Sequence, residues 1–338
     1  MTLPQGALWQ RMRQQALDAI PPGTVVDFRA PLTLGAWQAQ GTYTVSSASS
    51  SKFTIGVAPA DFGGALLADA AFHLDHALEH QASLMKGLAT GQWTSAAWQV
   101  VTFYYWAYFS AMALSRLLGQ TVWFVTADVA KQFNTLAPTN SASFTKGTYE
   151  VRCDRAINAG FRQIQLSKRS RRVHEQLWAT VFNFFSDLYN SVGAGGTSPE
   201  EERLFLAIIN SAQVLSSDWP STLRNVVNYR PGFAYTAPRF RNSIDSFSYL
   251  GVQGQAIDSI VDRLESGNVA MRAHPSVETH PKIAAKMLAD LTFLLNRLAH
   301  TLHDEVVDRC GIDRRWLMSK RRFSTQQGLV PAGMPWPC

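Results

Sequence analysis

Three histidines lie on one short stretch of the chain at a spacing that suits metal binding. His73, His76 and His80 occur in the sequence HLDHALEH, three and four residues apart. In a helix this spacing places all three on one face, where neutral imidazoles are ligands for Zn²⁺ or another transition metal. His300 and His303 repeat the three-residue spacing later in the chain. We favour the alternative of an exposed polar helix face, because the sequence has no HExxH motif, and we assign no metal or other cofactor.

Arginine and histidine together can cleave RNA without a metal ion. Arginine stabilises the negative charge of the phosphorane, and histidine removes the proton from the 2′-hydroxyl group. Arg169 precedes His174 with four residues between them, and Arg297 precedes His303 with five. The first pair is the better candidate, because its neighbours form a basic run that attracts phosphate. The second pair lies in a long predicted helix, where residues six apart do not share a face.

The positive charge of the chain is concentrated in two runs. The net charge is +6 and the pI about 9.3, which permits contact with nucleic acid without requiring it. The alternative is that each run is a solvated face. The candidate nucleic-acid-binding residues are Lys168, Arg171 and Arg172, followed near the C-terminus by Arg314, Arg315, Lys320, Arg321 and Arg322.

The longest uncharged stretch predicts the element on which the others pack. No charged residue or histidine lies between Lys86 and Arg116, which predicts a helix over residues 93–118 that is apolar on all sides. Its aromatic residues gather in the middle, whereas membrane-spanning helices carry Trp and Tyr at their ends. We therefore expect the central core helix of a soluble domain and no membrane partner.

Shorter amphipathic elements surround this helix. Ser198, Pro199 and Glu201 have the order of an N-cap, a first helical residue and the acid of a capping box. Apolar residues at helical spacing predict further helices over residues 8–20, 69–88, 173–192, 198–216, 218–230, 255–265 and 281–309. Alternating residues predict a strand at 24–28 and two hairpins, 42–45 with 52–57 and 148–153 with 161–166. The β-branched and aromatic run 121–126 predicts a further strand.

These elements define a mainly α fold of the α+β class, a helical bundle around residues 93–118 with small β-hairpins. We expect an N-terminal helix and hairpin region (1–66), a helical core (67–310) with a hairpin insertion at about 147–167, and a basic C-terminal arm (311–338). The three cysteines are far apart and odd in number, and the first 20 residues do not have the pattern of a signal peptide. A reducing, cytoplasmic location follows.

Two segments resemble the HEPN-like superfamily. The sequence AAWQVVTFYYWAYFSAMALSRLLG is similar to the paired-aromatic helix of that superfamily, and TLRNVVNYRP (residues 222–231) is similar to its Arg-Asn-led helix start. The resemblance covers residues 69–119 and 200–230. It implies a helical core and membership of a prokaryotic toxin–antitoxin, CRISPR or anti-phage system, in which many HEPN proteins are metal-independent ribonucleases.

The same resemblance implies a second candidate site, formed by Arg224, Asn225 and Tyr229. In many HEPN ribonucleases an arginine is followed by four to six residues and then a histidine. Here the fifth residue after Arg224 is Tyr229, and a phenol with a pKa near 10 is a poor base at neutral pH. These three residues are therefore either catalytic or structural.

The expected function is that of a HEPN-like component of a prokaryotic antiviral defence or toxin-type system. It would bind RNA or another nucleic acid, cleave RNA without metal if its site is complete, and join a protein partner in a multi-subunit complex or a second copy in a homodimer. Two alternatives remain open: a non-catalytic scaffold subunit that binds protein, and a metal-dependent hydrolase that uses the helical histidines.

Overall fold

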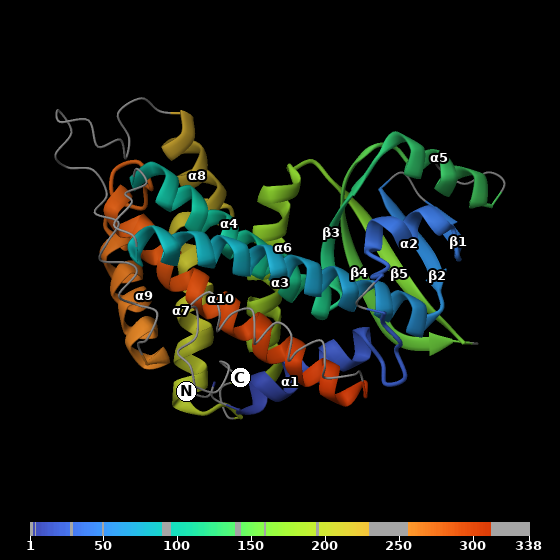
Figure 1. The fold of residues 1–338 in the computed structure, drawn as a ribbon, viewed down its shortest axis with the longest axis horizontal. Coiled ribbons are helices and arrows are strands. Elements are labelled where there is room, and N and C mark those ends of the chain that lie inside the picture. The colour runs from blue at the N-terminus through green and yellow to red at the C-terminus, as the bar shows by residue number, and fades with distance from the viewer. Residues whose placement is uncertain are drawn as a thin grey trace.

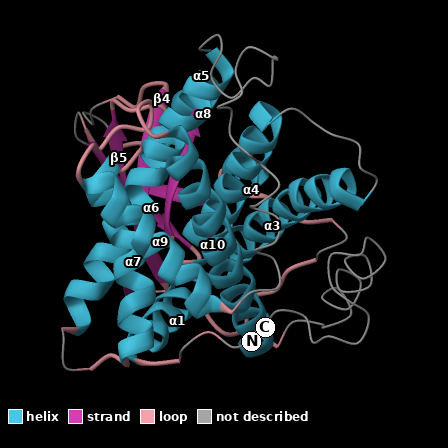
Figure 2. Ribbon diagram, turned by 90° about the vertical axis from the view of Figure 1, so that its left-hand side faces the viewer, coloured by secondary structure: helices cyan, strands magenta, loops and turns pink. Residues whose placement is uncertain are grey.

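The computed structural model describes residues 3, 5–27, 30–48, 51–89, 96–138, 143–158, 160–193, 196–229 and 256–311. Within these ranges the chain is mainly helical with one antiparallel sheet, so the predicted α+β class is confirmed. Figure 1 shows the strands at one side of the molecule, α7, α8 and α9 at the other, and α3, α4 and α10 running between them. The view in Figure 2 shows the strands behind α6.

The described part of the sheet has the strand order β1-β2-β5-β4-β3. The strands are β1 (Tyr43–Ala48), β2 (Lys52–Val57), β3 (Gln120–Val125), β4 (Gly147–Asn158) and β5 (Phe161–Arg169). Both predicted hairpins are present, as β1–β2 and β4–β5. They are not separate small hairpins, however, because β2 also pairs with β5 and β3 with β4. The sheet therefore joins the first hairpin to the one that we predicted as an insertion.

Alternation along the strands gives the sheet two different faces. The buried face is apolar and includes Tyr43, Val45, Phe53, Ile55, Val57, Tyr149, Val151, Ile164 and Leu166. The pairing register aligns the polar residues on the other side. We call this side the polar sheet face and define it by Lys52, Thr54, Glu150, Arg152, Gln163, Gln165, Ser167 and Arg169.

The helices occupy the remaining volume. Their bounds are α1 (Ala7–Ala19), α2 (Leu34–Gln40), α3 (Pro59–Ala89), α4 (Ala96–Leu117), α5 (Ala127–Leu136), α6 (Val173–Val192), α7 (Pro199–Leu215), α8 (Trp219–Tyr229), α9 (Ile257–Arg272) and α10 (Pro281–Arg309).

Helix α4 is the central element that the uncharged stretch predicts. It packs against α3 and α10 most extensively, and also against α6, α8 and β3. Most of its side chains are buried, including the fully enclosed Tyr104 and Trp106. Its first residue is Ala96; the predicted residues 93–95 lie outside the described ranges. No helix within the described ranges combines the length and the apolar character that a bilayer crossing requires.

The strand predicted at residues 24–28 is wrong: residues 24–27 have no strand structure, and residue 28 lies outside the described ranges. This segment lies against α3, which begins at Pro59, ten residues before the predicted start. A Cβ atom at Gly63 would lie only 3.0 Å from Pro21 Cδ and Thr24 Oγ1. The glycine therefore permits a close contact between the first turns of α3 and the segment before it.

The predicted capping box at the start of α7 is only half formed. Ser198 Oγ accepts a hydrogen bond from Glu201 N at 3.2 Å, as an N-cap should. The Glu201 carboxylate instead accepts hydrogen bonds from the first turn of α1, from Leu8 N at 3.2 Å and from Trp9 N at 2.6 Å. Glu201 is fully buried, so a residue of α7 serves as the N-terminal cap of α1.

Replacement of Glu201 by alanine is expected to destabilise the protein by about 2–3 kcal/mol, because two buried N–H groups lose their charged acceptor. The matched control is Glu200→Ala, since Glu200 lies next to it and is exposed; this change should alter stability by less than about 0.5 kcal/mol. Chemical denaturation measures both. Equal effects of the two substitutions would contradict the capping role.

Candidate functional site

Four polar side chains meet where α4, α6 and α8 pack together. We call Tyr104, His174, Ser221 and Arg224 the His174 cluster. The Tyr104 hydroxyl lies 2.8 Å from His174 Nδ1 and 3.1 Å from Ser221 Oγ. The Arg224 guanidinium carbon lies 5.4 Å from the centroid of the Tyr104 ring. Three helices that are distant in sequence thus contribute to one polar site.

Local sequence explains how each helix positions its residue. Tyr104 belongs to the central helix, whose burial brings its hydroxyl group into the interior. Helix α6 begins at Val173, so His174 lies in its first turn. In α8, Ser221 and Arg224 are three residues apart and share a face. The buried Trp219, Leu223 and Val227 fix the rotation of α8.

Aromatic rings enclose the imidazole of His174. The Tyr108 ring stacks on it with a centroid distance of 4.3 Å and an interplanar angle of 17°. The Tyr105 ring lies edge-on at 6.5 Å. Burial, together with the positive charge of Arg224, lowers the pKa of His174 to about 4. The imidazole is therefore neutral at pH 7, with one nitrogen available as an acceptor.

Arg224 is only half-buried, but its Nε atom is buried and has no hydrogen-bond partner in the described part of the chain. A buried donor without a partner is unfavourable, and guanidinium groups bind phosphate through such donors. Burial raises the pKa of Tyr104, although Ser221 and Arg224 oppose this change. Tyr104 therefore stays a neutral phenol that can donate one proton.

Two hydrogen-bond arrangements satisfy the distances around Tyr104. In one, His174 Nδ1–H donates to Tyr104, and the Tyr104 hydroxyl donates to Ser221. In the other, the Tyr104 hydroxyl donates to Nδ1. Only the first leaves a lone pair on His174 Nε2, as a general base requires. The chain of Ser221, Tyr104 and His174 can therefore fix the tautomer that catalysis would need.

In the structure His174 and Arg224 lie near the same residue, Tyr104, whereas the spacing in the sequence paired His174 with Arg169. Arg169 lies at the end of β5, where its Nε and Nη2 atoms donate to Glu150 Oε2 at 2.8 and 2.5 Å. Tyr229 is the last residue of α8 and is 74% exposed. Asn225 is half-buried in the same helix. Of the three residues implied by the HEPN resemblance, Arg224 alone belongs to the His174 cluster.

The first basic run lies between the sheet and the His174 cluster. Lys168 Nζ donates to Thr145 Oγ1. Arg171 Nη1 donates to Ser217 Oγ at 3.1 Å, just before α8, and Arg172 is exposed. The second run, Arg314, Arg315, Lys320, Arg321 and Arg322, lies outside the described residues.

The three helical histidines share one face of α3, as predicted, and that face packs on α4. The rings of His73, His76 and His80 all stack on Phe109, with centroid distances of 5.9, 4.9 and 5.5 Å. His73 Nε2 lies 3.4 Å from Asp69 Oδ2. Burial lowers the pKa of His73 and of His80. Across the described ranges, no group of three or more His, Cys, Asp or Glu is arranged to hold a metal ion.

The other Arg–His pair lies in α10. His303 is almost fully buried, and its Nδ1 atom lies 3.4 Å from Asp304 Oδ1. Buried positions on the core side of a long helix are occupied for packing, so the pair with Arg297 has the weaker structural support.

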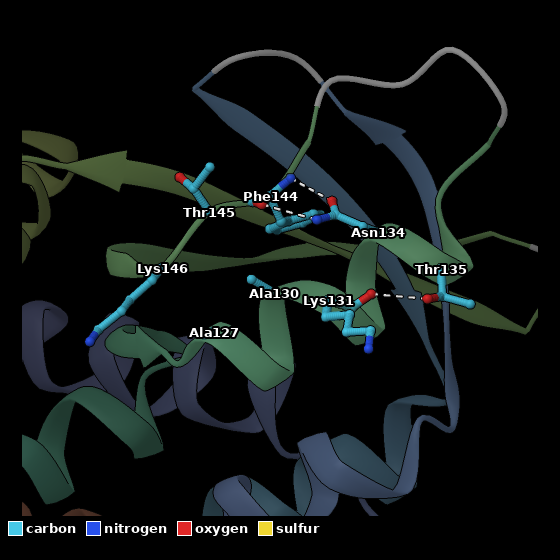
Figure 3. A pocket seen from close by; sticks show the side chains of 8 residues that line it. All are labelled: Ala127, Ala130, Lys131, Asn134, Thr135, Phe144, Thr145 and Lys146. Atoms are coloured by element: carbon cyan, nitrogen blue, oxygen red, sulfur yellow. Dashed lines mark hydrogen bonds between the residues drawn. The ribbon is translucent and has the colours of Figure 1, made fainter.

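A hollow of about 530 Å³ lies between α5 and the segment that leads into β4 (Figure 3). Lys131 and Lys146 are its charged lining residues. The Asn134 side chain is hydrogen-bonded to the backbone of Phe144: its Nδ2 atom donates to Phe144 O at 3.0 Å, and its Oδ1 atom accepts from Phe144 N at 2.6 Å. The hollow shares no lining residue with the His174 cluster, and α5 and α8 lie at opposite ends of the view in Figure 1.

Sequence reasoning identified His174 and Arg224 but did not pair them, and it did not name Tyr104 or Ser221 as site residues. One signal was present for Tyr104, since a buried tyrosine hydroxyl normally has a hydrogen-bond partner. Ser221 carries no such signal.

The fold and the site together define a mainly helical α+β protein with an Arg–His–Tyr cluster between three helices. No family model, curated protein or solved structure matches this chain.

Proposed function

We propose that this protein binds RNA and cleaves it without a metal ion, as a HEPN-like component of a prokaryotic defence or toxin-type system. The observation that supports this proposal best is that the neutral His174 and the half-buried Arg224 both lie at Tyr104, close enough for the charge of Arg224 to lower the pKa of His174. A base and a cation close together are the two groups that cleavage at a 2′-hydroxyl requires. The HEPN resemblance of residues 222–231 includes this same Arg224.

The proposed reaction begins when His174 Nε2 takes the proton of a 2′-hydroxyl group. The 2′ oxygen then attacks the neighbouring phosphorus, and the bond from phosphorus to the 5′ oxygen breaks. The leaving oxygen receives a proton from the imidazolium group, which restores neutral His174. The products are a 2′,3′-cyclic phosphate and a 5′-hydroxyl group. Arg224 stabilises the charge on the phosphoryl oxygens.

The low pKa of His174 fits this role when the substrate is considered. A base with a pKa of about 4 is weak, since general bases work best near the operating pH. A phosphate group bound at Arg224 brings negative charge next to the imidazole, and an opposite charge raises the pKa of a cationic acid. Substrate binding therefore activates the base.

The experiment that tests the proposal uses the purified full chain and a labelled single-stranded RNA in EDTA. We expect cleavage to continue in EDTA and to leave 2′,3′-cyclic phosphate ends. The same strand with 2′-O-methyl groups is the control and should stay intact, because it lacks the nucleophile. Cleavage that stops in EDTA and returns with zinc would contradict the proposal and favour a metal-dependent hydrolase.

A second candidate function, a non-catalytic subunit that binds a protein partner, has one observation in its favour. Trp98 near the start of α4 and Tyr229 at the end of α8 are 63% and 74% exposed. Large exposed aromatic side chains are enriched at protein interfaces. Intact RNA in the experiment above, with or without divalent cations, would favour this function.

A further inference from the structure

The polar sheet face presents exposed hydrogen-bonding groups along β5. Gln163, Gln165 and Arg169 are exposed at alternate positions of β5. The register places Thr54 of β2 and Arg152 of β4 on either side of Gln165. Helix α6 packs on β3 and, less extensively, on β4. The side chains of β5 on this face therefore remain open to solvent.

Two arginines on this face are held in place by one buried carboxylate. Arg152 Nε donates to Glu150 Oε1 at 2.8 Å, and Arg169 Nε donates to Glu150 Oε2 at 2.8 Å. The Glu150 side chain is only 4% exposed, whereas those of Arg152 and Arg169 are 48% and 45% exposed. Although burial opposes it, the two arginines lower the pKa of Glu150. The two arginine side chains are thus held in place while nearly half of each side chain faces solvent.

The charge of this region is positive. On the polar sheet face as defined, three basic residues (Lys52, Arg152 and Arg169) outnumber the one carboxylate, Glu150. Lys146 lies at the same end of the sheet as Arg169, and the exposed Asp154 follows Arg152 in β4. A positive surface with preorganised guanidinium groups complements a phosphate backbone.

Exposed aromatic side chains lie at both ends of this surface. Phe161, at the start of β5, is 48% exposed, and Phe124 of β3 is 49% exposed. Phe124 aligns with Thr148 and hence with Arg169 at the other end of β5. Lys146 Nζ lies 5.9 Å from the Phe124 ring centroid. Exposed aromatic rings beside basic groups are the surface on which unpaired bases stack.

The surface leads to the His174 cluster. Strand β5 ends at Arg169, and α6 begins at Val173. Between them, Arg171 donates to Ser217, which precedes the helix that carries Arg224. The length of β5, at about 3.3 Å per residue, gives a path of roughly 27 Å, enough for several nucleotides of an extended strand.

We propose that single-stranded RNA lies across the polar sheet face, with its bases stacked on Phe161 and Phe124 and its phosphates on Arg152 and Arg169, and passes Arg171 to reach the His174 cluster. The proposal rests on the function proposed above and adds the substrate class, an unpaired strand. A double helix presents no free base faces to the aromatic rings, and a protein partner would not require the positive charge.

The test measures binding by fluorescence anisotropy to a labelled RNA of about 12 nucleotides. The His174→Ala chain is the baseline, so that the RNA stays intact. In that background, the double change Gln163→Glu and Gln165→Glu should weaken binding roughly 10-fold or more, because it adds two negative charges to the path of the phosphates. Phe161→Ala should weaken binding roughly 5-fold or more through loss of base stacking.

The matched control is the double change Gln10→Glu and Gln14→Glu on the exposed side of α1, which alters the net charge equally. It should change the affinity less than about 2-fold, because salt screens charges that lie far from the bound RNA. Thermal melting checks that each variant is folded. If the sheet variants bind like this control, if the RNA is not bound, or if a duplex of the same sequence binds equally well, the proposal is overturned.

The outcome separates this proposal from the proposed catalysis. Cleavage that depends on His174, with binding insensitive to the sheet changes, would leave the ribonuclease function standing and remove the RNA path. Binding that depends on the sheet, with no cleavage by the unaltered chain, would support the RNA path and remove the catalytic role.

Discussion

Replacement of His174 by alanine is expected to reduce RNA cleavage by about 10²–10⁴-fold, the usual contribution of a general base. RNA binding should change little, because the basic surface remains. The expected loss of cleavage follows from the position of Nε2, the nitrogen that the hydrogen bond between Nδ1 and Tyr104 leaves available to act as the base. Single-turnover cleavage of a labelled RNA measures the rate without interference from product release.

The control is His76→Ala, which removes a partly exposed histidine from α3. It should leave the rate unchanged within about 2-fold, the ordinary result for a substitution remote from the reacting groups. A loss of activity in His76→Ala but not in His174→Ala would contradict the assignment and favour the helical histidines. Circular dichroism should show both variants folded.

The pH dependence of cleavage gives a second readout of His174. Its pKa of about 4 in the free protein predicts that kcat/KM falls only as the pH drops toward 4, because protonation then removes the base. The fall in kcat should begin at a higher pH, since the bound phosphate raises the pKa of His174 in the complex. A fall in kcat/KM that is centred near pH 6.5 would show that the pKa of the histidine is not lowered, and would contradict the effect of burial and Arg224.

Replacement of Arg116 by methionine is expected to destabilise the protein by about 3–5 kcal/mol, because it leaves a buried carboxylate without its partner. Arg116 Nε donates to Asp69 Oδ2 at 2.7 Å, and both side chains are nearly buried. Arg116 Nη1 also donates to Thr121 Oγ1 and, at 3.1 Å, to Val122 O. One guanidinium group thus connects α3, α4 and β3. Chemical denaturation at pH 7 measures the change.

The pH dependence of this loss of stability shows whether the unpaired charge of Asp69 causes it. Burial favours the protonated carboxyl, but Arg116 and His73 outweigh it and lower the pKa of Asp69. The stabilisation is therefore present above the unfolded pKa of about 3.9 and is lost as the pH falls through the lower folded value. In Arg116→Met the carboxyl is protonated more readily, so the deficit in stability should shrink toward pH 4. The exposed Arg11→Met is the control; a deficit independent of pH would point to lost packing instead.

The local pattern of apolar and polar residues was sufficient to predict those elements that have either one buried face or no exposed face. Alternation predicted both hairpins, because each strand has one apolar and one polar face. The uncharged stretch predicted α4, because a helix enclosed on all sides needs no polar face. Pattern failed at the start of α3, which begins at Pro59 and not at residue 69, and where Gly63 allows a close contact with Thr24. It also gave no prediction for α2, a helix of seven residues capped by Thr33.

The candidate site was less predictable, since its geometry depends on long-range packing. A spacing of five residues suggested that Arg169 and His174 act together, but the first ends a strand and bonds to Glu150, whereas the second lies inside a helix. The partners of His174 come from α4 and α8, 70 residues before it in the case of Tyr104. No local rule relates positions so far apart. The shared face of the three histidines was predicted correctly, but the aromatic surface against which it packs was not.

The pairing of β2 with β5 has a consequence for the order of folding. Val57 and Arg162 are partners in this ladder, although roughly 100 residues separate them. Until β5 has been synthesised, the free edge of β2 presents unpaired backbone groups that can join another chain. Closing so long a loop also slows folding. The sheet can therefore close only after β5 has been synthesised, although β1 and β2 are made much earlier, and the surface proposed to bind RNA forms only when synthesis has passed residue 169.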